Sequence, residues 1–490
     1  MKRMKYLFAG MFALSVSLGV NAQTVDYKEA LKPITTALES SSTDPKELKS
    51  LVKSYKKEFK KNPAAIVALG YSYFGIKDYT SATECADLAL KINNKFGDAY
   101  VLKGDICSIQ DDGGGAATWY QNAMTQDPKN PNGYLGYANV YRKRDPQGAE
   151  AAINQLRQTN PEFPVDAELG HLMFNADNMD KAFDYYSKSN MDKLSEGRLA
   201  EYALVAGSVD KKDKALEIAK FGLGKFPTSK AFLRLAIINS VGTEKYDEAV
   251  NFAKKLIAEE GENNSGDLIY YGQALAGLGQ FDEAIAKFNK AIEVDSKNIM
   301  PYQHISETYA KMGNEDKAIE YSKKYLELNP NAKISEYTKL AGIYMAKMKK
   351  GENPEENYAN AMSVYDGVAA KYPQLKSWSL YSKANETFKA EMDEQALNLY
   401  NEVVNELENK ADRDRDETNY LATAYRNGGY ILWSSKGDTD AARPYFEKLL
   451  KIDPENSLAK KYFEAEAAAN AEAAAAAEGE AAPAEQQVTE

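Results

Sequence analysis

Histidine, cysteine and tryptophan are scarce in this sequence, whose 490 residues include two, two and three of them. His171 and His304 lie far apart in the chain, and neither has a neighbour at the spacing of a zinc site, which needs three or four ligands. We therefore expect both histidines at the surface or in contacts. No metal site, no cofactor and no catalytic centre is expected, and the protein is predicted not to be an enzyme.

One partial motif does not change this expectation. Asp412-x-Asp414-x-Asp416 opens like a calcium-binding loop, but Glu417 stands where that loop needs glycine. We expect these aspartates to lie on a solvent-exposed helical face instead.

An excess of positive charge is also absent, since 61 Lys and Arg residues stand against 72 Asp and Glu residues. The net charge is −11, and loss of Lys2, Arg3 and Lys5 with an N-terminal signal would make it roughly −14. Nucleic acid and anionic membrane surfaces attract positive charge. We therefore expect neither nucleic acid nor a membrane surface as the partner.

The only long apolar run lies at the N-terminus, and it predicts a cleaved signal peptide over residues 1–22. Basic residues precede the run Tyr6–Leu14, and Val20-Asn-Ala22 places small residues before a cut at Gln23. A retained anchor is the alternative, but the run is short of the ~20 residues that span a bilayer. No cysteine follows the cut, which argues against a lipoprotein. We expect an exported, most simply periplasmic, chain without stable membrane insertion.

The two cysteines, Cys85 and Cys107, fall on neighbouring predicted helices. Export permits oxidation, so a disulfide and two free thiols both remain open at this point. Sequence does not supply the Cβ geometry that a disulfide requires.

The stretch from Ser265 to Asn331 contains one unit twice, offset by 34 residues. Gly279 aligns with Gly313 and Ala284 with Ala318. A fixed period of this size indicates a stacked array of one supersecondary unit. Each unit has apolar residues at the spacing of two amphipathic helices joined by a glycine turn, and Asp282 and Asp316 are expected to cap the second helices.

Small residues recur where the two helices of a unit would cross. Gly272, Ala284 and Ala291 leave room for close approach, while Tyr271 and Phe288 fill the space around them. At these residues, and at the closing Pro330, the chain resembles the tetratricopeptide repeat family. The resemblance implies an all-α fold, a right-handed superhelical solenoid of antiparallel helix pairs.

The small residue of the second helix marks about eleven repeats over residues 63–456. Six prolines follow it at a distance of twelve residues and are expected to stop the second helix. The small residues are Ala82, Ala116, Ala149, Ala182, Ala215, Ala249, Ala284, Ala318, Ala361, Ala396 and Ala442.

Atypical segments flank this array. Residues 23–62 are predicted to be a helical cap or degenerate repeat, with an interruption at Pro33. Residues 457–490 are predicted to form a capping helix and an Ala/Glu-rich disordered tail. Insertions at 349–356 and 409–417 are expected to be extra surface residues that the fold tolerates, and a binding loop is the alternative.

The candidate binding residues occupy first-helix positions that face the concave side in the resembled family. Aromatic side chains there could anchor a peptide. The alternatives are that Phe74 and Phe174 only pack in the core and that residues 26–61 cover the groove. The candidates are Tyr71, Phe74, Asp105, Asn139, Arg142, His171 and Phe174.

The expected function is that of a non-catalytic periplasmic scaffold or adaptor. Its partner would be a protein or peptide, or an envelope complex, held in the groove of the array. The alternative is a glycan- or peptidoglycan-binding accessory protein, because the chain contains 33 tyrosines. Most of these tyrosines are expected to be used by the repeat core.

Export predicts that the mature chain begins near Gln23, because the small residues before it suit signal peptidase. N-terminal sequencing of the secreted product checks this expectation. An uncleaved chain recovered from the inner membrane would contradict it.

Overall fold

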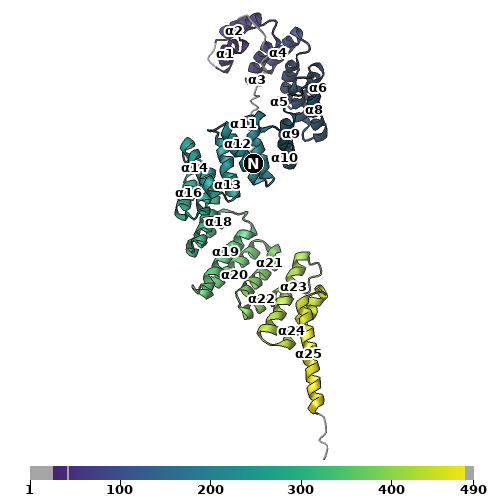
Figure 1. Cartoon of the computed structure of the whole chain (residues 1–490), viewed down its shortest axis with the longest axis vertical. Helices are drawn as coiled ribbons and strands as arrows, with labels where there is room; N and C mark the ends of the chain where they lie inside the picture. Colours follow the sequence, from purple (N-terminus) through teal and green to yellow (C-terminus); the bar gives the residue numbers. More distant parts are fainter. Residues whose placement is uncertain (1–25, 41–43, 481–490) are drawn as a thin grey trace, which may run out of the picture. The chain divides into compact units, whose positions relative to one another are not determined.

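The computed structural model describes residues 26–40 and 44–480, and every regular element within them is a helix (Figure 1). The predicted signal peptide at 1–22 and the last ten residues lie outside the described part. The chain divides into two compact units between Asn239 and Ser240. Each unit is a stack of helix pairs, so the predicted all-α solenoid is confirmed.

Unit 1 consists of twelve α-helices, the 3-10 helix η1 and the first part of α13. Its elements are α1 (Tyr27–Glu39), α2 (Pro45–Glu58), α3 (Pro63–Gly75), α4 (Tyr79–Ile92), α5 (Gly97–Ile109), α6 (Gly113–Gln126), α7 (Pro131–Tyr141), α8 (Pro146–Thr159), α9 (Val165–Asn175), α10 (Met179–Ser187), η1 (Met191–Lys193), α11 (Glu196–Ser208) and α12 (Lys212–Lys225).

The division between the units falls inside α13 (Lys230–Gly242). Unit 2 continues with α14 (Tyr246–Glu260), α15 (Ser265–Gly277), α16 (Phe281–Val294), α17 (Met300–Lys311), α18 (Glu315–Leu328), α19 (Ile334–Lys349), α20 (Pro354–Lys371), the 3-10 helix η2 (Pro373–Leu375), α21 (Lys376–Lys389), α22 (Asp393–Leu407), α23 (Arg415–Tyr430), the π-helix η3 (Ile431–Ser435), α24 (Thr439–Ile452) and α25 (Ser457–Glu480).

Helices α3 to α12 form five successive pairs in unit 1, and helices α15 to α24 form five in unit 2. The second helix of each pair carries the alanine expected at the crossing, and α14 of unit 2 carries the remaining one, Ala249. All eleven of these alanines are fully buried. In the pair α15/α16 the first helix is also small at the crossing, where it carries Gly272. A Cβ atom on Gly272 would lie 2.5 Å from the ring of Phe288, so the helices have no space for a larger side chain there.

Proline ends the second helix where the sequence places it. In six pairs the last helical residue is followed two positions later by proline, because proline cannot donate the next backbone hydrogen bond. These prolines are Pro128, Pro161, Pro227, Pro330, Pro373 and Pro454.

Two local expectations are wrong. Pro33 does not interrupt the N-terminal segment, because it lies inside the continuous helix α1. Its missing N–H costs one hydrogen bond, while the neighbouring Ile34 is buried in the core of unit 1. Asp282 and Asp316 do not cap their helices either. They lie in the first turn, and Asn314 is the residue that caps α18.

The ends of the array are closed by atypical helices. At the N-terminal end, α1 and α2 form a pair that packs on α3, where the Thr35 and Ser72 hydroxyls lie 3.0 Å apart. At the C-terminal end, Tyr462 of α25 is fully buried against Phe446, with ring centroids 4.7 Å apart. Helix α25 then continues to Glu480, farther than the cap requires.

The residues of both insertions, 349–356 and 409–417, take part in helix ends and in local hydrogen bonds. The first lengthens α19 and α20 and turns at Gly351, whose φ of +81° is in the left-handed region. In the second, the Arg413 guanidinium donates to three backbone carbonyls, among them Leu407 O at 2.6 Å. Asp414 caps α23 by accepting from Glu417 N, so this aspartate has a structural role.

The cysteines are free thiols in the structure. Cys85 is buried on α4, and burial raises the pKa of its thiol to about 11. Cys107 on α5 is partly exposed, and burial also raises its pKa. Both groups are therefore poor nucleophiles at neutral pH.

None of the described helices is both long enough and apolar enough to cross a membrane.

Because Ala284 is fully buried where α16 crosses its partner, Ala284→Leu should destabilise the protein by about 1–3 kcal/mol through overpacking. Denaturant unfolding measures the change. Ala286→Leu, at an exposed position of the same helix, is the matched control and should leave the free energy of unfolding nearly unchanged. Equal effects of the two substitutions would contradict the crossing argument.

Candidate functional site

The first helices of successive pairs contact one another directly. In unit 1, α3 contacts α5, α5 contacts α7, α7 contacts α9 and α9 contacts α11. In unit 2, α15 contacts α17 and α21 contacts α23. Successive second helices, such as α4 and α6, do not contact one another to the same extent, so the first helices lie on the inside of the curve. We call the surface formed by these first helices the inner face of each unit.

Tyr71 and Asp105 occupy the same inner position one repeat apart, and they are hydrogen-bonded. The Tyr71 hydroxyl donates to one carboxylate oxygen of Asp105 at 2.7 Å, and the Tyr120 hydroxyl donates to the other at 2.7 Å. Burial raises the pKa of Asp105, and the two hydroxyl groups oppose that shift. Burial also raises the pKa of Tyr71, so the phenol stays a donor. This triad ties α3, α5 and α6 together.

The two candidate phenylalanines pack into hydrophobic clusters. Phe74 lies edge-on to Tyr71, with ring centroids 6.1 Å apart, and also packs against Tyr79. Phe174 packs against the cluster that includes Tyr186 and Tyr202. Their partial burial suits the packing alternative better than a role as free anchors.

Asn139 and Arg142 form a local pair on α7. Arg142 donates through one guanidinium nitrogen to the Asn139 side-chain oxygen at 2.7 Å and to its backbone carbonyl. The buried Arg142 Nε atom has no hydrogen-bond partner among the described residues. Arg142 also borders a surface cleft with Met173 and Lys181.

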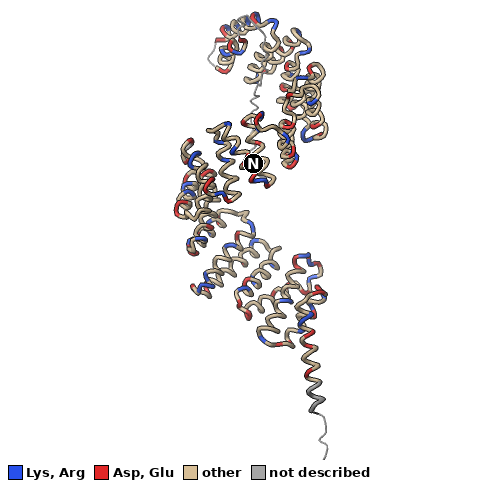
Figure 2. The backbone as a smooth tube through the Cα atoms, in the orientation of Figure 1, with Lys and Arg blue, Asp and Glu red and all other residues tan. Residues whose placement is uncertain are grey.

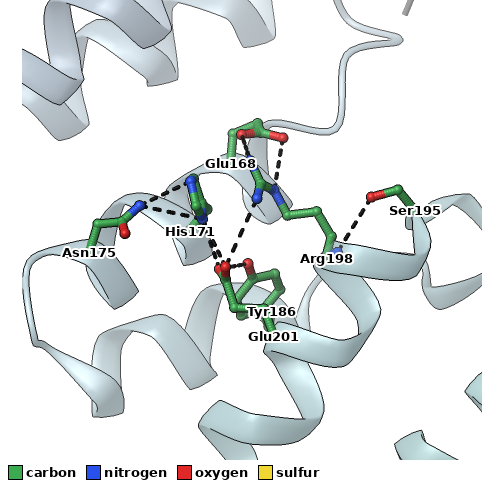
Figure 3. Close-up of polar contacts among 7 residues, drawn as sticks. All are labelled: Glu168, His171, Asn175, Tyr186, Ser195, Arg198 and Glu201. Carbon is green, nitrogen blue, oxygen red and sulfur yellow. Dashed lines mark hydrogen bonds and ion pairs between the residues drawn. The ribbon is translucent and has the colours of Figure 1, made fainter. Parts of the chain in front are cut away.

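His171 is the centre of a polar cluster on the inner face of unit 1 (Figure 3). Its Nδ1 atom lies 2.9 Å from a Glu201 carboxylate oxygen, and its Nε2 atom lies 2.9 Å from the Asn175 amide nitrogen. With Asn175 donating to Nε2, the imidazole is the tautomer that carries hydrogen on Nδ1 and donates it to Glu201. The Tyr186 hydroxyl donates to the same Glu201 oxygen. Burial, helped by the Glu201 charge, raises the pKa of Tyr186 and keeps this donor protonated.

Arg198 links this cluster to the preceding first helix. It makes two parallel bonds to the Glu168 carboxylate, at 2.8 and 3.2 Å, and its other nitrogen lies 4.0 Å from Glu201. Burial disfavours the charged guanidinium, but Glu168 outweighs that effect and raises the pKa of Arg198. One cation, Arg198, therefore lies between the carboxylates of Glu168 and Glu201.

The cluster joins side chains of α9, α10 and α11 through hydrogen bonds and ion pairs. Figure 3 also draws Ser195, which is not bonded to His171. The Ser195 Oγ atom accepts a hydrogen bond from Arg198 N and caps α11. No set of three or more potential metal ligands is gathered anywhere in the described residues. The cluster offers a hydrogen-bonded group of donors and acceptors in which Tyr186 is fully buried. The other charged and imidazole side chains are about one-eighth to one-quarter exposed, namely Glu168, His171, Arg198 and Glu201.

Unit 2 has a corresponding network on its inner face. Gln273 on α15 lies 2.8 Å from His304 Nε2 on α17, and His304 Nδ1 lies 3.4 Å from Glu307. Lys339 on α19 donates to Glu307 at 3.0 Å. Burial alone would raise the pKa of Glu307, but hydrogen bonds from His304 and Lys339 outweigh it and lower the pKa to about 2.

The structure thus joins Tyr71 to Asp105 and Asn139 to Arg142, while His171 bonds to residues that sequence reasoning did not name. The missed residues are Tyr120, Glu168, Asn175, Tyr186, Arg198 and Glu201. A signal for part of this set was present: Tyr71 and Asp105 are 34 residues apart, and both His171–Glu201 and Glu168–Arg198 are 30 residues apart. Complementary polar residues separated by about one repeat identify contacts between neighbouring first helices.

Paired helices with buried small residues at each crossing, stacked so that first helices form an inner face, define a helical-repeat solenoid. Tetratricopeptide repeat models match residues 266–298, 301–332 and 422–456. The chain contains tetratricopeptide repeats, and such repeats imply protein partners.

Solved structures with similar folds cover parts of the chain. The C-terminal part of a TPR repeat-containing protein from Cytophaga hutchinsonii is 19% identical, with a TM-score of 0.41, over 54% of this chain and 98% of that one. MamA from Desulfovibrio magneticus RS-1 is 16% identical, with a TM-score of 0.31, over 34% and 98%. The structure titled MamA MSR-1 is 22% identical, with a TM-score of 0.30, over 34% and 94%. No curated protein matches the chain.

The lowered pKa of Glu307 means that its charged form stabilises the fold above the ordinary glutamate pKa of about 4.5, and that this contribution is lost as the pH falls toward 2. The side chain is 40% exposed, so after allowance for solvent screening the contribution is about 1 kcal/mol. Glu307→Gln should cost about that much at pH 7 and progressively less below pH 4.5, as measured by urea unfolding across pH.

Glu320→Gln is the matched control, because Glu320 is exposed on α18. It should change stability little at any pH. A cost for Glu307→Gln that does not vary with pH would show that the Glu307 charge is not the source of the stabilisation.

Proposed function

We propose that the protein is an exported, non-catalytic scaffold that holds a polypeptide partner on the inner face of unit 1. The observation that carries the proposal is the polar surface from Asn139 to Glu201, built on the successive first helices α7, α9 and α11. Its side chains are partly exposed and already fixed by hydrogen bonds. A partner therefore meets groups whose rotamer entropy has already been lost, which lowers the cost of binding.

Polar groups of this kind suit a polypeptide. A peptide backbone offers one donor and one acceptor at each residue. The inner face offers Arg142 and Arg198 as donors and Glu168 and Glu201 as acceptors, with the imidazole of His171 between them. Phe74, Phe174 and Tyr71 contribute to the stability of this face through packing and through the bond to Asp105, so we assign the binding contacts to Asn139, Arg142 and His171.

Export rests on the N-terminal sequence, in which a basic start, an apolar run and small residues precede Gln23. The periplasm is the simplest destination, and the partner would then be an envelope protein. The glycan-binding alternative rests only on the number of tyrosines, and some of these, among them Tyr186, Tyr400 and Tyr462, are fully buried in the cores of the two units.

The test is recovery of partners from an envelope extract on the immobilised mature chain, followed by binding measurements with the purified partner. Arg142→Ser with His171→Ser should weaken binding at least about tenfold, equivalent to ~1.4 kcal/mol. Asp184→Ser is the matched control, since Asp184 is exposed on the second helix α10. It should leave affinity unchanged.

Thermal melting of both variants separates loss of contact from loss of fold. Unchanged affinity of a folded Arg142/His171 variant would place the partner elsewhere. Binding of defined peptidoglycan fragments, with no protein recovered by the wild type, would favour the glycan alternative instead.

A further inference from the structure

Helix α2 carries a lysine-rich face that is unlike the rest of this acidic chain. Residues 45–61 contain seven lysines and two glutamates, in a chain whose net charge is −11. Lys46, Lys49, Lys53 and Lys57 recur at intervals of three and four residues, so they lie on one side of the helix, and Lys60 follows in the next turn. All five are exposed. We call this surface the lysine stripe; Figure 2 shows the charges of α2 at the N-terminal end of unit 1.

No ion pair within the described part of the protein accounts for the lysine stripe. None of its members makes an ion pair with a carboxylate in the described part of the chain, whereas lysines elsewhere, such as Lys103 with Asp87 at 2.7 Å, do so. The opposite side of α2 packs Tyr55 and Phe59 into the core of unit 1. The stripe is therefore a surface of unpaired positive charge, about 17 Å long from Lys46 to Lys57.

An anionic membrane is not the best fit for this surface. Helices that bind at membrane interfaces insert large apolar side chains beside their basic residues. Here those side chains point into unit 1, and none of the large hydrophobic residues exposed in the described chain belongs to α2. The remaining acidic charge of the protein would also be repelled by anionic lipid.

The chain itself contains a complementary segment. From residue 462 to the end there are seven glutamates and no basic residue. Helix α25 extends past the point where Tyr462 covers the last pair, and its exposed side chains include Glu464 and Glu472. From Glu464 to Glu480 the helix measures about 24 Å, a length comparable with the lysine stripe.

We propose that the lysine stripe binds the acidic C-terminal segment, residues 464–490, of a second copy of this chain. The two surfaces belong to different ends of the sequence, so each copy offers one stripe and one tail for a head-to-tail contact. Such heterologous contacts give rings where the rotation between copies closes and open chains where it does not. Because the pairs are exposed, the association is weak, additive over several charges and sensitive to salt.

Sedimentation of the full mature chain tests this proposal. At an ionic strength of about 0.02 M the average mass should rise with concentration beyond that of a dimer, and at about 0.5 M it should fall to that of the monomer. Lys49→Glu/Lys53→Glu/Lys57→Glu should lower the association constant at least about tenfold. The control Lys91→Glu/Lys129→Glu/Lys297→Glu changes the net charge equally at scattered exposed sites and should associate like the wild type.

The tail is tested with reciprocal charges. Glu472→Lys/Glu478→Lys/Glu480→Lys alone should lose self-association, and a mixture of this variant with the Lys49/Lys53/Lys57 variant should regain it. A monomer at every concentration and salt, or failure of the mixture to associate, would overturn the proposal. Binding of phosphatidylglycerol vesicles that depends on the stripe, without self-association, would overturn it in favour of a lipid surface.

Discussion

Close approach of two helices at one crossing point is the constraint on which the whole structure depends. The crossing requires a residue with almost no side chain, and eleven fully buried alanines provide it. Large neighbours such as Phe288 and Tyr186 then occupy the volume beside the crossing, as shown by how near a Cβ on Gly272 or Gly170 would lie to those rings. Since each pair buries its remaining apolar surface against the next pair, the stack grows without a single large core. This is how a chain of 490 residues remains a one-dimensional assembly within each unit.

Polar side chains on the inner face fix how neighbouring pairs sit against each other. Apolar packing tolerates small shifts, but the bidentate bond between Arg198 and Glu168 has one favourable geometry. The bond between Tyr71 and Asp105 acts in the same way between α3 and α5. Both bonds join residues about one repeat apart, so they specify the stacking of adjacent pairs within unit 1. In unit 2, Lys339 and Glu307 have the corresponding effect between α19 and α17.

The sequence was sufficient for the fold because the fold depends on a period and on residue size. The spacing of Ala284 and Ala318 reveals both, and each alanine is buried at its crossing. Helix ends were less predictable. Asp316 and Asn314 are both good caps, and only the backbone decides which one is at the first position of α18. The candidate site was the least predictable part. His171 could be placed on the inner face, but its bonds to Glu201 and Asn175 depend on the rotation of one helix against the next.

Hydrogen bonds already made within the inner face limit the kind of partner that it can hold. A ligand that broke the bonds of Glu201 to His171 and Tyr186 would leave a partly buried and a fully buried donor unpaired, at a cost of about 1–3 kcal/mol for each group. A favourable ligand must therefore add to the network through atoms that still have free capacity, such as the second oxygen of a carboxylate or the free edge of a guanidinium. Extended backbone meets this condition because its donors and acceptors project singly on both sides. The hydrogen bonds within the inner face thus favour partners that bind to its exposed polar atoms. They disfavour partners that must break the existing bonds between its side chains.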